Sequence, residues 1–175
     1  MKYHPGGEEH TRNLISLAEG LGLTAGMKVL DMGAGGGEAV RILQQRGYSA
    51  AGVDLEPGSL LVEKGNMLQT GYPDGSFDAV LSQCAFFVSG RPEQAAHEAH
   101  RLLRSGGLLL LSDVFFPEPA LPGFRILQSE DMTQEWREYY LEALWRGEDC
   151  GCEVPRGSCR YLMLIARKEL ENGSV

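Results

Sequence analysis

A glycine-rich loop between an apolar strand and an amphipathic helix limits most strongly what this chain can fold into. Residues 28–31 have the composition of a short buried strand, and four of the five residues 33–37 are glycine. Residues 38–46 follow with apolar positions at helical spacing, and residues 50–53 form a second apolar run that ends at Asp54. Because two consecutive strands joined through a helix lie parallel, this unit predicts a parallel sheet.

The same alternation of strands and helices continues along the 175 residues. Further strands are predicted at residues 77–82, 108–116 and 160–167, and further helices at residues 11–21, 93–104 and 133–145. The proline-rich residues 117–123 read as a loop. This pattern indicates an α/β fold, a doubly wound and mostly parallel sheet of about six or seven strands.

The connection between the second and third strands is unusually short. Only residues 55–59 separate the second strand from the next apolar run, residues 60–62. A parallel crossover normally takes a dozen or more residues, usually including a helix. We therefore expect the helix between strands two and three to be shortened or missing, or the third strand to be vestigial.

The glycine loop has the context of a cofactor-binding loop, and two kinds of cofactor fit such loops. A dinucleotide loop reads G-x-G-x-x-G, but counting from Gly33 or from Gly35 places Glu38 or Val40 where the third glycine should stand. S-adenosylmethionine carries an ammonium group and no phosphate, and the carboxylate of Asp31 suits that ammonium. A second carboxylate, Asp54, ends the next strand and can accept hydrogen bonds from ribose hydroxyls.

Five segments in order resemble the class I S-adenosylmethionine-dependent methyltransferases, in particular the small-molecule type related to quinone-biosynthesis C-methyltransferases. They are VLDMGAGGG (29–37), GVDL (52–55), GNM (65–67), PDGSFDAVL (73–81) and RLLRSGG (101–107). The resemblance implies a Rossmann-like fold and S-adenosyl-L-methionine as the methyl donor. Asn66 stands where the family usually has an aspartate, and its side-chain oxygen can still accept a hydrogen bond from an adenine amino group.

The resemblance also implies a set of cofactor-binding residues. At the methionine end these are Asp31, Gly33, Gly35 and Gly37; Asp54 and Leu55 serve the ribose and adenine, Asn66 and Met67 the adenine edge, and Gln83 and Cys84 line the site. No catalytic residue and no metal ligand is predicted. We divide a single domain into an N-terminal helix with a lid (1–26), a cofactor-binding core (27–116) and an acceptor side (117–175).

The net charge and the lengths of the apolar runs limit which kinds of binding partner and cellular location we expect. The net charge of −8 disfavours binding to a phosphate backbone, and no N/D-P-P-Y run follows the fourth predicted strand, so a small-molecule acceptor is favoured over nucleic acid. The longest apolar run, residues 161–166, is far shorter than the roughly 20 residues of a membrane-spanning helix. With no apolar signal sequence at the N-terminus, we expect a cytoplasmic protein that does not bind membranes.

Several side chains allow two interpretations. His4 and His10 could act as a base or contact a ligand, although N-terminal histidines are more often solvated. Cys84 could contact a ligand or pack as a small apolar residue. The aromatic residues of the helix at 133–145 could form an acceptor-binding wall or pack on the sheet. Cys150, Cys152 and Cys159 could bind a thiophilic metal or metalloid, or be incidental thiols.

Two broader questions stay open on the sequence alone. Without a crossover helix, apolar surface near Leu55 and Leu60 would be exposed, and such surface often marks association, here with a second copy of the chain. The shortened crossover and Asn66 also leave room for a non-catalytic module that binds S-adenosylmethionine. A nicotinamide-dependent oxidoreductase is the remaining alternative.

Overall fold

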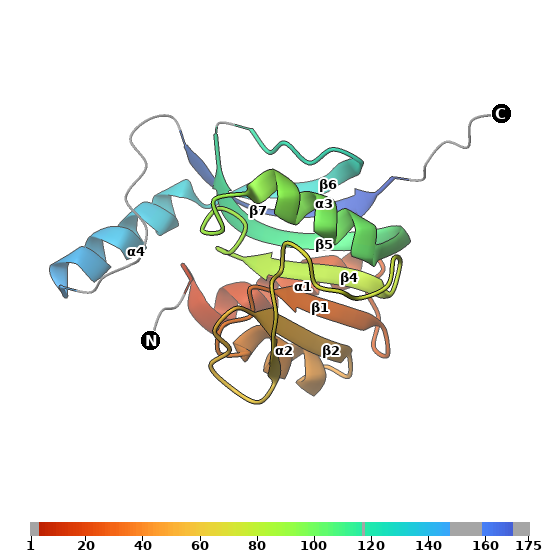
Figure 1. The fold of residues 1–175 in the computed structure, drawn as a ribbon. Helices are drawn as coiled ribbons and strands as arrows, with labels where there is room; N and C mark the ends of the chain where they lie inside the picture. Colours follow the sequence, from red (N-terminus) through yellow and green to blue (C-terminus); the bar gives the residue numbers. More distant parts are fainter. Residues whose placement is uncertain (1–3, 117, 148–158, 170–175) are drawn as a thin grey trace.

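The computed structural model describes residues 4–116, 118–147 and 159–169, which form one seven-stranded sheet flanked by helices (Figure 1). In chain order the elements are α1 (Gly7–Gly20), β1 (Lys28–Met32), α2 (Glu38–Gln45), β2 (Ser49–Asp54), β3 (Val62–Lys64), β4 (Phe77–Gln83), α3 (Pro92–Leu102), β5 (Leu103–Phe115), β6 (Phe124–Asp131), α4 (Thr133–Trp145) and β7 (Arg160–Lys168). Within this described part, no helix is both long and apolar enough to cross a membrane.

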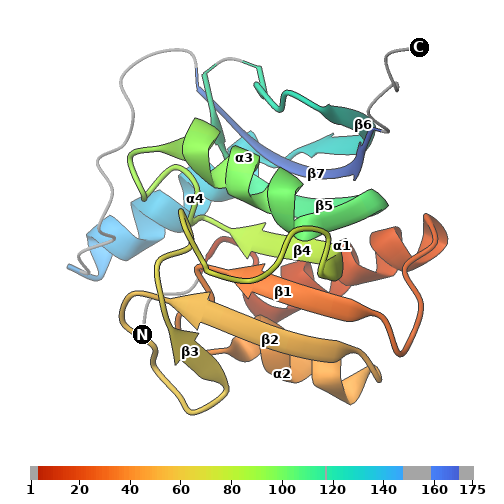
Figure 2. The same ribbon diagram turned by 45° about the vertical axis from the view of Figure 1, so that its right-hand side comes forward.

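The strands lie in the order β3-β2-β1-β4-β5-β7-β6 (Figure 2). β7 is antiparallel to both β5 and β6, and the other pairs are parallel, which confirms the predicted mostly parallel sheet. The chain builds outward from β1 to β3 on one side and then continues with β4 on the other. The order therefore reverses between β1 and β4, the point at which open α/β sheets bind ligands beyond the carboxyl ends of their strands.

Two apolar layers cover the sheet because successive strand residues point to opposite faces. Val29 of β1 packs in the layer that contains the buried sides of α1 and α2, whereas Leu30 packs in the layer under α3. Leu108 and Leu109 of β5 divide in the same way. Figure 1 shows α3 on one face and α1 with α2 on the other.

Two predicted boundaries are wrong. Helix α1 begins at Gly7 rather than at residue 11, and Thr11 lies fully buried inside it. Residues 103 and 104, which we expected to end a helix, belong to β5, because α3 ends at Leu102 and the strand begins at the next residue.

Strand β6 has no counterpart among the predicted strands. Of its eight residues only Phe124 is buried, so the segment lacks the apolar alternation by which a strand is recognised. It forms because its backbone pairs along β7, from Phe124 opposite Lys168 to Asp131 opposite Leu162. The pairing is set by the tertiary structure rather than by the local sequence.

The crossover between β2 and β3 contains no helix, as predicted. Residues 55–61 are turns and irregular backbone, and β3 is a three-residue strand paired with Gly52–Asp54 of β2. The apolar side chains beside it are exposed: Leu55 by 63%, Leu60 fully and Leu61 by 41%. The predicted exposed apolar surface is therefore present.

Candidate functional site

The loops that follow β1 and β4 touch one another at the point where the strand order reverses. Gly33, the first residue after β1, has a φ of +80°, and a Cβ placed on it would lie 2.2 Å from the Cβ of Ala85. The same Cβ would lie 3.5 Å from the sulfur of Met67, which comes from the connection between β3 and β4. Three segments distant in sequence thus meet around one residue that only glycine can occupy.

The end of β2 holds the glycine loop in place. The backbone N–H groups of Gly33 and Ala34 both donate to the carbonyl of Val53, at 2.9 and 3.1 Å. The N–H of Gly35 donates to Oδ2 of Asp54 at 2.8 Å, and the N–H of Glu56 donates to Oδ1 of the same carboxylate at 2.9 Å. Asp54 thus positions the loop, and each of its oxygens keeps a second acceptor site for a ligand hydroxyl.

Asp31 is a buried carboxylate directly behind this loop. It lies in β1 between Gly52 of β2 and Leu81 of β4, and its side chain is only 4% exposed. Burial, and secondarily the nearby charge of Asp54, raises the pKa of Asp31 to about 7. Within the described residues no group donates a hydrogen bond to it. A buried carboxylate in this condition favours a bound cation.

The short crossover lies on top of the glycine loop. The N–H of Gly58 donates to the carbonyl of Gly35 at 2.8 Å. A Cβ on Gly37, whose φ is +80°, would lie 3.0 Å from both Ser59 Oγ and Val62 Cγ2. Gly37 is therefore needed for packing against residues 59–62 as well as for any approach by a ligand.

The residues expected at the adenine edge lie close to the loop but are open to solvent. Asn66 is exposed, and its Oδ1 accepts a hydrogen bond from the N–H of Leu68 at 2.9 Å. Met67 is half-buried beside Gly33, and Leu55 is exposed. The Asn66 oxygen retains one acceptor site for an amino group.

The N-terminal segment lies against the end of β4. The hydroxyl of Thr11 donates to Gln83 Oε1 at 3.0 Å and lies 3.1 Å from His4 Nε2. The Nε2 of Gln83 is buried and has no partner among the described residues. Burial lowers the pKa of His4, while the charge of Glu38, the first residue of α2, acts in the opposite direction. His4, Thr11 and Gln83 thus form a hydrogen-bonded chain beside the glycine loop.

Cys84 begins a second, more aromatic side of the site. Its φ of +56° is unusual for a residue other than glycine, and such backbone strain occurs often at functional sites. Its Sγ lies 3.2 Å from the hydroxyl of Tyr161, a buried residue that stacks on Trp136 of α4 with ring centres 6.1 Å apart. Cys159 is buried in the same cluster.

The histidine of α1 is part of this buried region. His10 is only 4% exposed and its Nε2 lies 2.7 Å from Ser112 Oγ in β5, so the expectation of a solvated side chain is wrong for this residue. Burial, and then the neighbouring His4, lowers the pKa of His10 to about 4, which leaves its imidazole neutral at pH 7. The helical spacing of His10 from the buried Leu14 was the available sequence signal.

Only part of the cysteine group that could bind a metal or metalloid lies within the described residues. Cys150 and Cys152 lie outside the described residues. Cys84 and Cys159 form no disulfide. Among the described residues no group of three or more histidine, cysteine, aspartate or glutamate side chains could hold a metal ion.

A seven-stranded sheet of this order, with a glycine loop after β1 and a carboxylate at the end of β2, defines an α/β protein of the class I methyltransferase type. Residues 30–111 match the family described as the methyltransferase domain. This part of the chain is similar to that family, and the resemblance drawn from the five sequence segments is confirmed.

Individual relatives agree with this assignment. An uncharacterised methyltransferase of Synechocystis sp. is 32% identical over 124 residues, which cover 64% of this chain and 58% of the relative. A demethylmenaquinone methyltransferase of Tropheryma whipplei is 31% identical over 109 residues, which cover 55% and 46%. The chain thus spans about half the length of these relatives.

The fold also agrees with a solved structure. Phosphoethanolamine N-methyltransferase 2 of Haemonchus contortus, crystallised with S-adenosyl-L-methionine, superimposes with a TM-score of 0.67 at 18% identity, and the match covers 95% of this chain and 54% of that one.

Proposed function

We propose that this protein transfers a methyl group from S-adenosylmethionine to a small-molecule acceptor. The observation that carries the proposal is Asp31: a buried carboxylate without a described donor, placed behind the glycine loop where the strand order reverses. The match of residues 30–111 to the methyltransferase domain supports the same function. A dinucleotide does not fit as well, because its pyrophosphate would lie at the N-terminus of α2, beside the carboxylate of Glu38.

The residues present fit this methyl donor. Asp31 would neutralise the ammonium of its amino-acid end, and Gly33, Gly35 and Gly37 would let the backbone come close to it. The unused acceptor sites of Asp54 would take ribose hydroxyls. Leu55 and Met67 would contact the adenine faces, and Oδ1 of Asn66 would accept from the adenine amino group. The donor supplies its own leaving group, so the protein contributes mainly orientation and exclusion of water.

The acceptor side of the site would begin at Gln83 and Cys84. The orphaned Nε2 of Gln83 offers a hydrogen bond to a polar group of the donor or the acceptor. Beyond Cys84, Tyr161 and Trp136 form a buried aromatic cluster behind this side of the site. A neutral His10, behind Ser112, is a weak base, which favours an acceptor that does not need strong deprotonation.

Isothermal titration with S-adenosylhomocysteine tests the cofactor site directly. We expect saturable binding that Asp54→Ala weakens, whereas reduced nicotinamide dinucleotide gives no saturable heat. No binding of S-adenosylhomocysteine, or tighter binding of the dinucleotide, would overturn the proposal. Transfer of radiolabelled methyl groups to a panel of phenols, quinols, amines and thiols then identifies the acceptor class.

A non-catalytic binding module is the second candidate. The observation that favours it is the crossover, where Gly58 lies on Gly35 and the backbone already uses both oxygens of Asp54. Tight cofactor binding with no methyl transfer to any member of the panel would favour this alternative over an enzyme.

We also propose that a second copy of the chain covers the exposed leucines of the crossover. Leu60 and Leu61 directly precede the three-residue edge strand, and Leu55 begins the same crossover. The outer side of this strand has no neighbouring strand in the sheet. Light scattering over a concentration series should show a dimer that Leu60→Asp dissociates and Val88→Asp, at another exposed apolar position, does not. A monomer at every concentration would refute this.

The net charge and the state of the cysteines bear on nucleic-acid binding and on cellular location. A net charge of −8 supports a protein that does not bind nucleic acid. Thiols at Cys84 and Cys159 that form no disulfide support a reducing, cytoplasmic location.

A further inference from the structure

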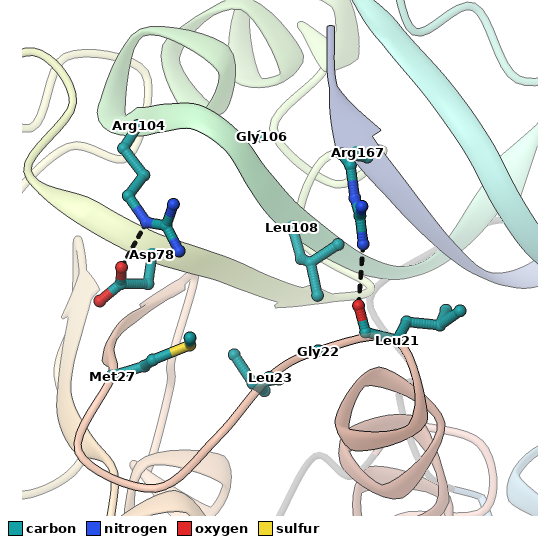
Figure 3. Close-up of a pocket in the computed structure, with 9 residues that line it drawn as sticks. All are labelled: Leu21, Gly22, Leu23, Met27, Asp78, Arg104, Gly106, Leu108 and Arg167. Carbon is teal, nitrogen blue, oxygen red and sulfur yellow. Dashed lines mark hydrogen bonds and ion pairs between the residues drawn. The ribbon is translucent and has the colours of Figure 1, made fainter.

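A cavity of about 190 Å³ lies at the edge of the sheet opposite the proposed cofactor site (Figure 3). It is bounded by the loop between α1 and β1 and by residues near the amino ends of β4 and β5. The last residues of the antiparallel β7 reach the same edge, where Arg167 pairs with Leu108. Its volume is smaller than that of pockets for drug-sized ligands and suits a small ion or acid.

Two guanidinium groups enter this cavity from β5 and β7 (Figure 3). Arg104 uses its Nε in an ion pair with Asp78, and no other described group accepts from its guanidinium. Arg167 donates through Nη2 to the carbonyl of Leu21 at 2.8 Å. Its Nε is buried and has no partner in the described part of the chain. A buried donor without an acceptor is unfavourable, so an acceptor bound beside it would be stabilised.

The charge around the cavity has the opposite sign to that of the whole chain. Lys28, whose charge acts on Asp78, joins Arg104 and Arg167 as a third cation, and Asp78 is the one carboxylate among the lining residues. The chain as a whole carries −8. A local excess of cations on an acidic protein favours a bound anion, because guanidinium forks match the geometry of oxyanions.

We propose that this cavity binds a small oxyanion, the phosphate or carboxylate group of a small molecule. The anion would accept from Nε of Arg167 and from the unused Nη atoms of Arg104, above an apolar floor formed by Leu108. It would tie the loop after α1 to β5 and β7, beyond the single hydrogen bond that Arg167 now makes to Leu21. The site is independent of the proposed methyl transfer.

Calorimetric titration of the full chain with inorganic phosphate at constant ionic strength tests the proposal, with malonate and acetate as parallel ligands. We expect saturable heat for phosphate or for malonate, and which of the two binds more tightly identifies the anion class. Arg167→Met should weaken that binding at least about tenfold, the loss expected for one charge-assisted contact. The matched control Arg137→Met removes an exposed arginine of α4 and should leave binding unchanged.

Phosphate stabilises many proteins without binding at a specific site. The outcome therefore depends on whether the binding heat saturates and on the comparison of Arg167→Met with Arg137→Met. A linear, non-saturating response of the wild type, or equal responses of Arg167→Met and Arg137→Met, would overturn the proposal. If Arg167→Met does not fold, Arg104→Met provides the same comparison, because it removes the other guanidinium and leaves Arg167 in place.

Discussion

Replacing Asp31 by asparagine should make the protein more stable and its cofactor site weaker. Burial raises the pKa of Asp31 from 3.8 to about 7. The unfolded chain therefore releases this proton at lower pH than the folded chain, and ionisation of Asp31 destabilises the fold. The cost begins near pH 4, grows as the pH rises, and is complete above about pH 7.

The pKa difference gives the size of the effect. At 1.36 kcal/mol per pKa unit, the cost of the Asp31 charge is about 2 kcal/mol at pH 5 and about 4 kcal/mol at pH 8. Asparagine has almost the same shape and no charge. Urea unfolding should therefore show Asp31→Asn to be more stable than the wild type, with a gain that roughly doubles between pH 5 and pH 8.

The same charge should support binding of the cofactor. Only ionised Asp31 attracts the ammonium, so the affinity for S-adenosylhomocysteine should fall about tenfold from pH 8 to pH 6 in the wild type. Asp31→Asn should bind more weakly and lose this pH dependence. Methylthioadenosine, which lacks the amino-acid end, should show no such dependence with either protein.

Asp113 is a matched control for the stability measurement. Burial raises the pKa of Asp113 to about 6 although the N–H groups of Val114, Phe87 and Phe86 donate to it and lower that pKa. Asp113→Asn places an amide NH₂ among those donors and should destabilise the protein. The reasoning fails if Asp31→Asn is no more stable than the wild type at pH 8, or if its gain does not change with pH.

Two further substitutions test the glycine loop and the Arg101–Glu98 ion pair of α3. Gly33→Ala should reduce binding of S-adenosylhomocysteine by tenfold or more in calorimetric titration, because its Cβ would lie 2.2 Å from that of Ala85, whereas Gly36→Ala, with open space around it, should bind normally. Arg101→Met should cost roughly 3 kcal/mol in urea unfolding, because it removes the only charged partner described for the buried carboxylate of Glu98, 2.7 Å from the guanidinium, and leaves it with the donors of Thr70 alone. A loss below about 1 kcal/mol would contradict this.

The parts of the fold that follow from local pattern could be predicted from the sequence. The apolar runs of β1, β4 and β5 and the spacing of Ala39, Ile42 and Leu43 in α2 identify these elements because each buries its own side chains. The short crossover was predictable because the five residues 55–59 cannot hold a helix and two turns. Strand β6 was not, because its single buried residue, Phe124, carries no alternation.

The candidate site likewise has a part that local sequence predicts and a part that depends on tertiary packing. Asp31, Gly33 and Asp54 lie within one continuous strand-loop-helix-strand unit, and the order of residues alone indicates that they come together. The proposed acceptor side depends instead on pairs far apart in the chain, such as Thr11 with Gln83 and His10 with Ser112. Their positions are set by how α1 crosses the ends of β4 and β5, a property of packing that no local pattern encodes. The methyl donor is therefore much easier to infer than the acceptor: one local unit binds the donor, and several distant segments form the acceptor side.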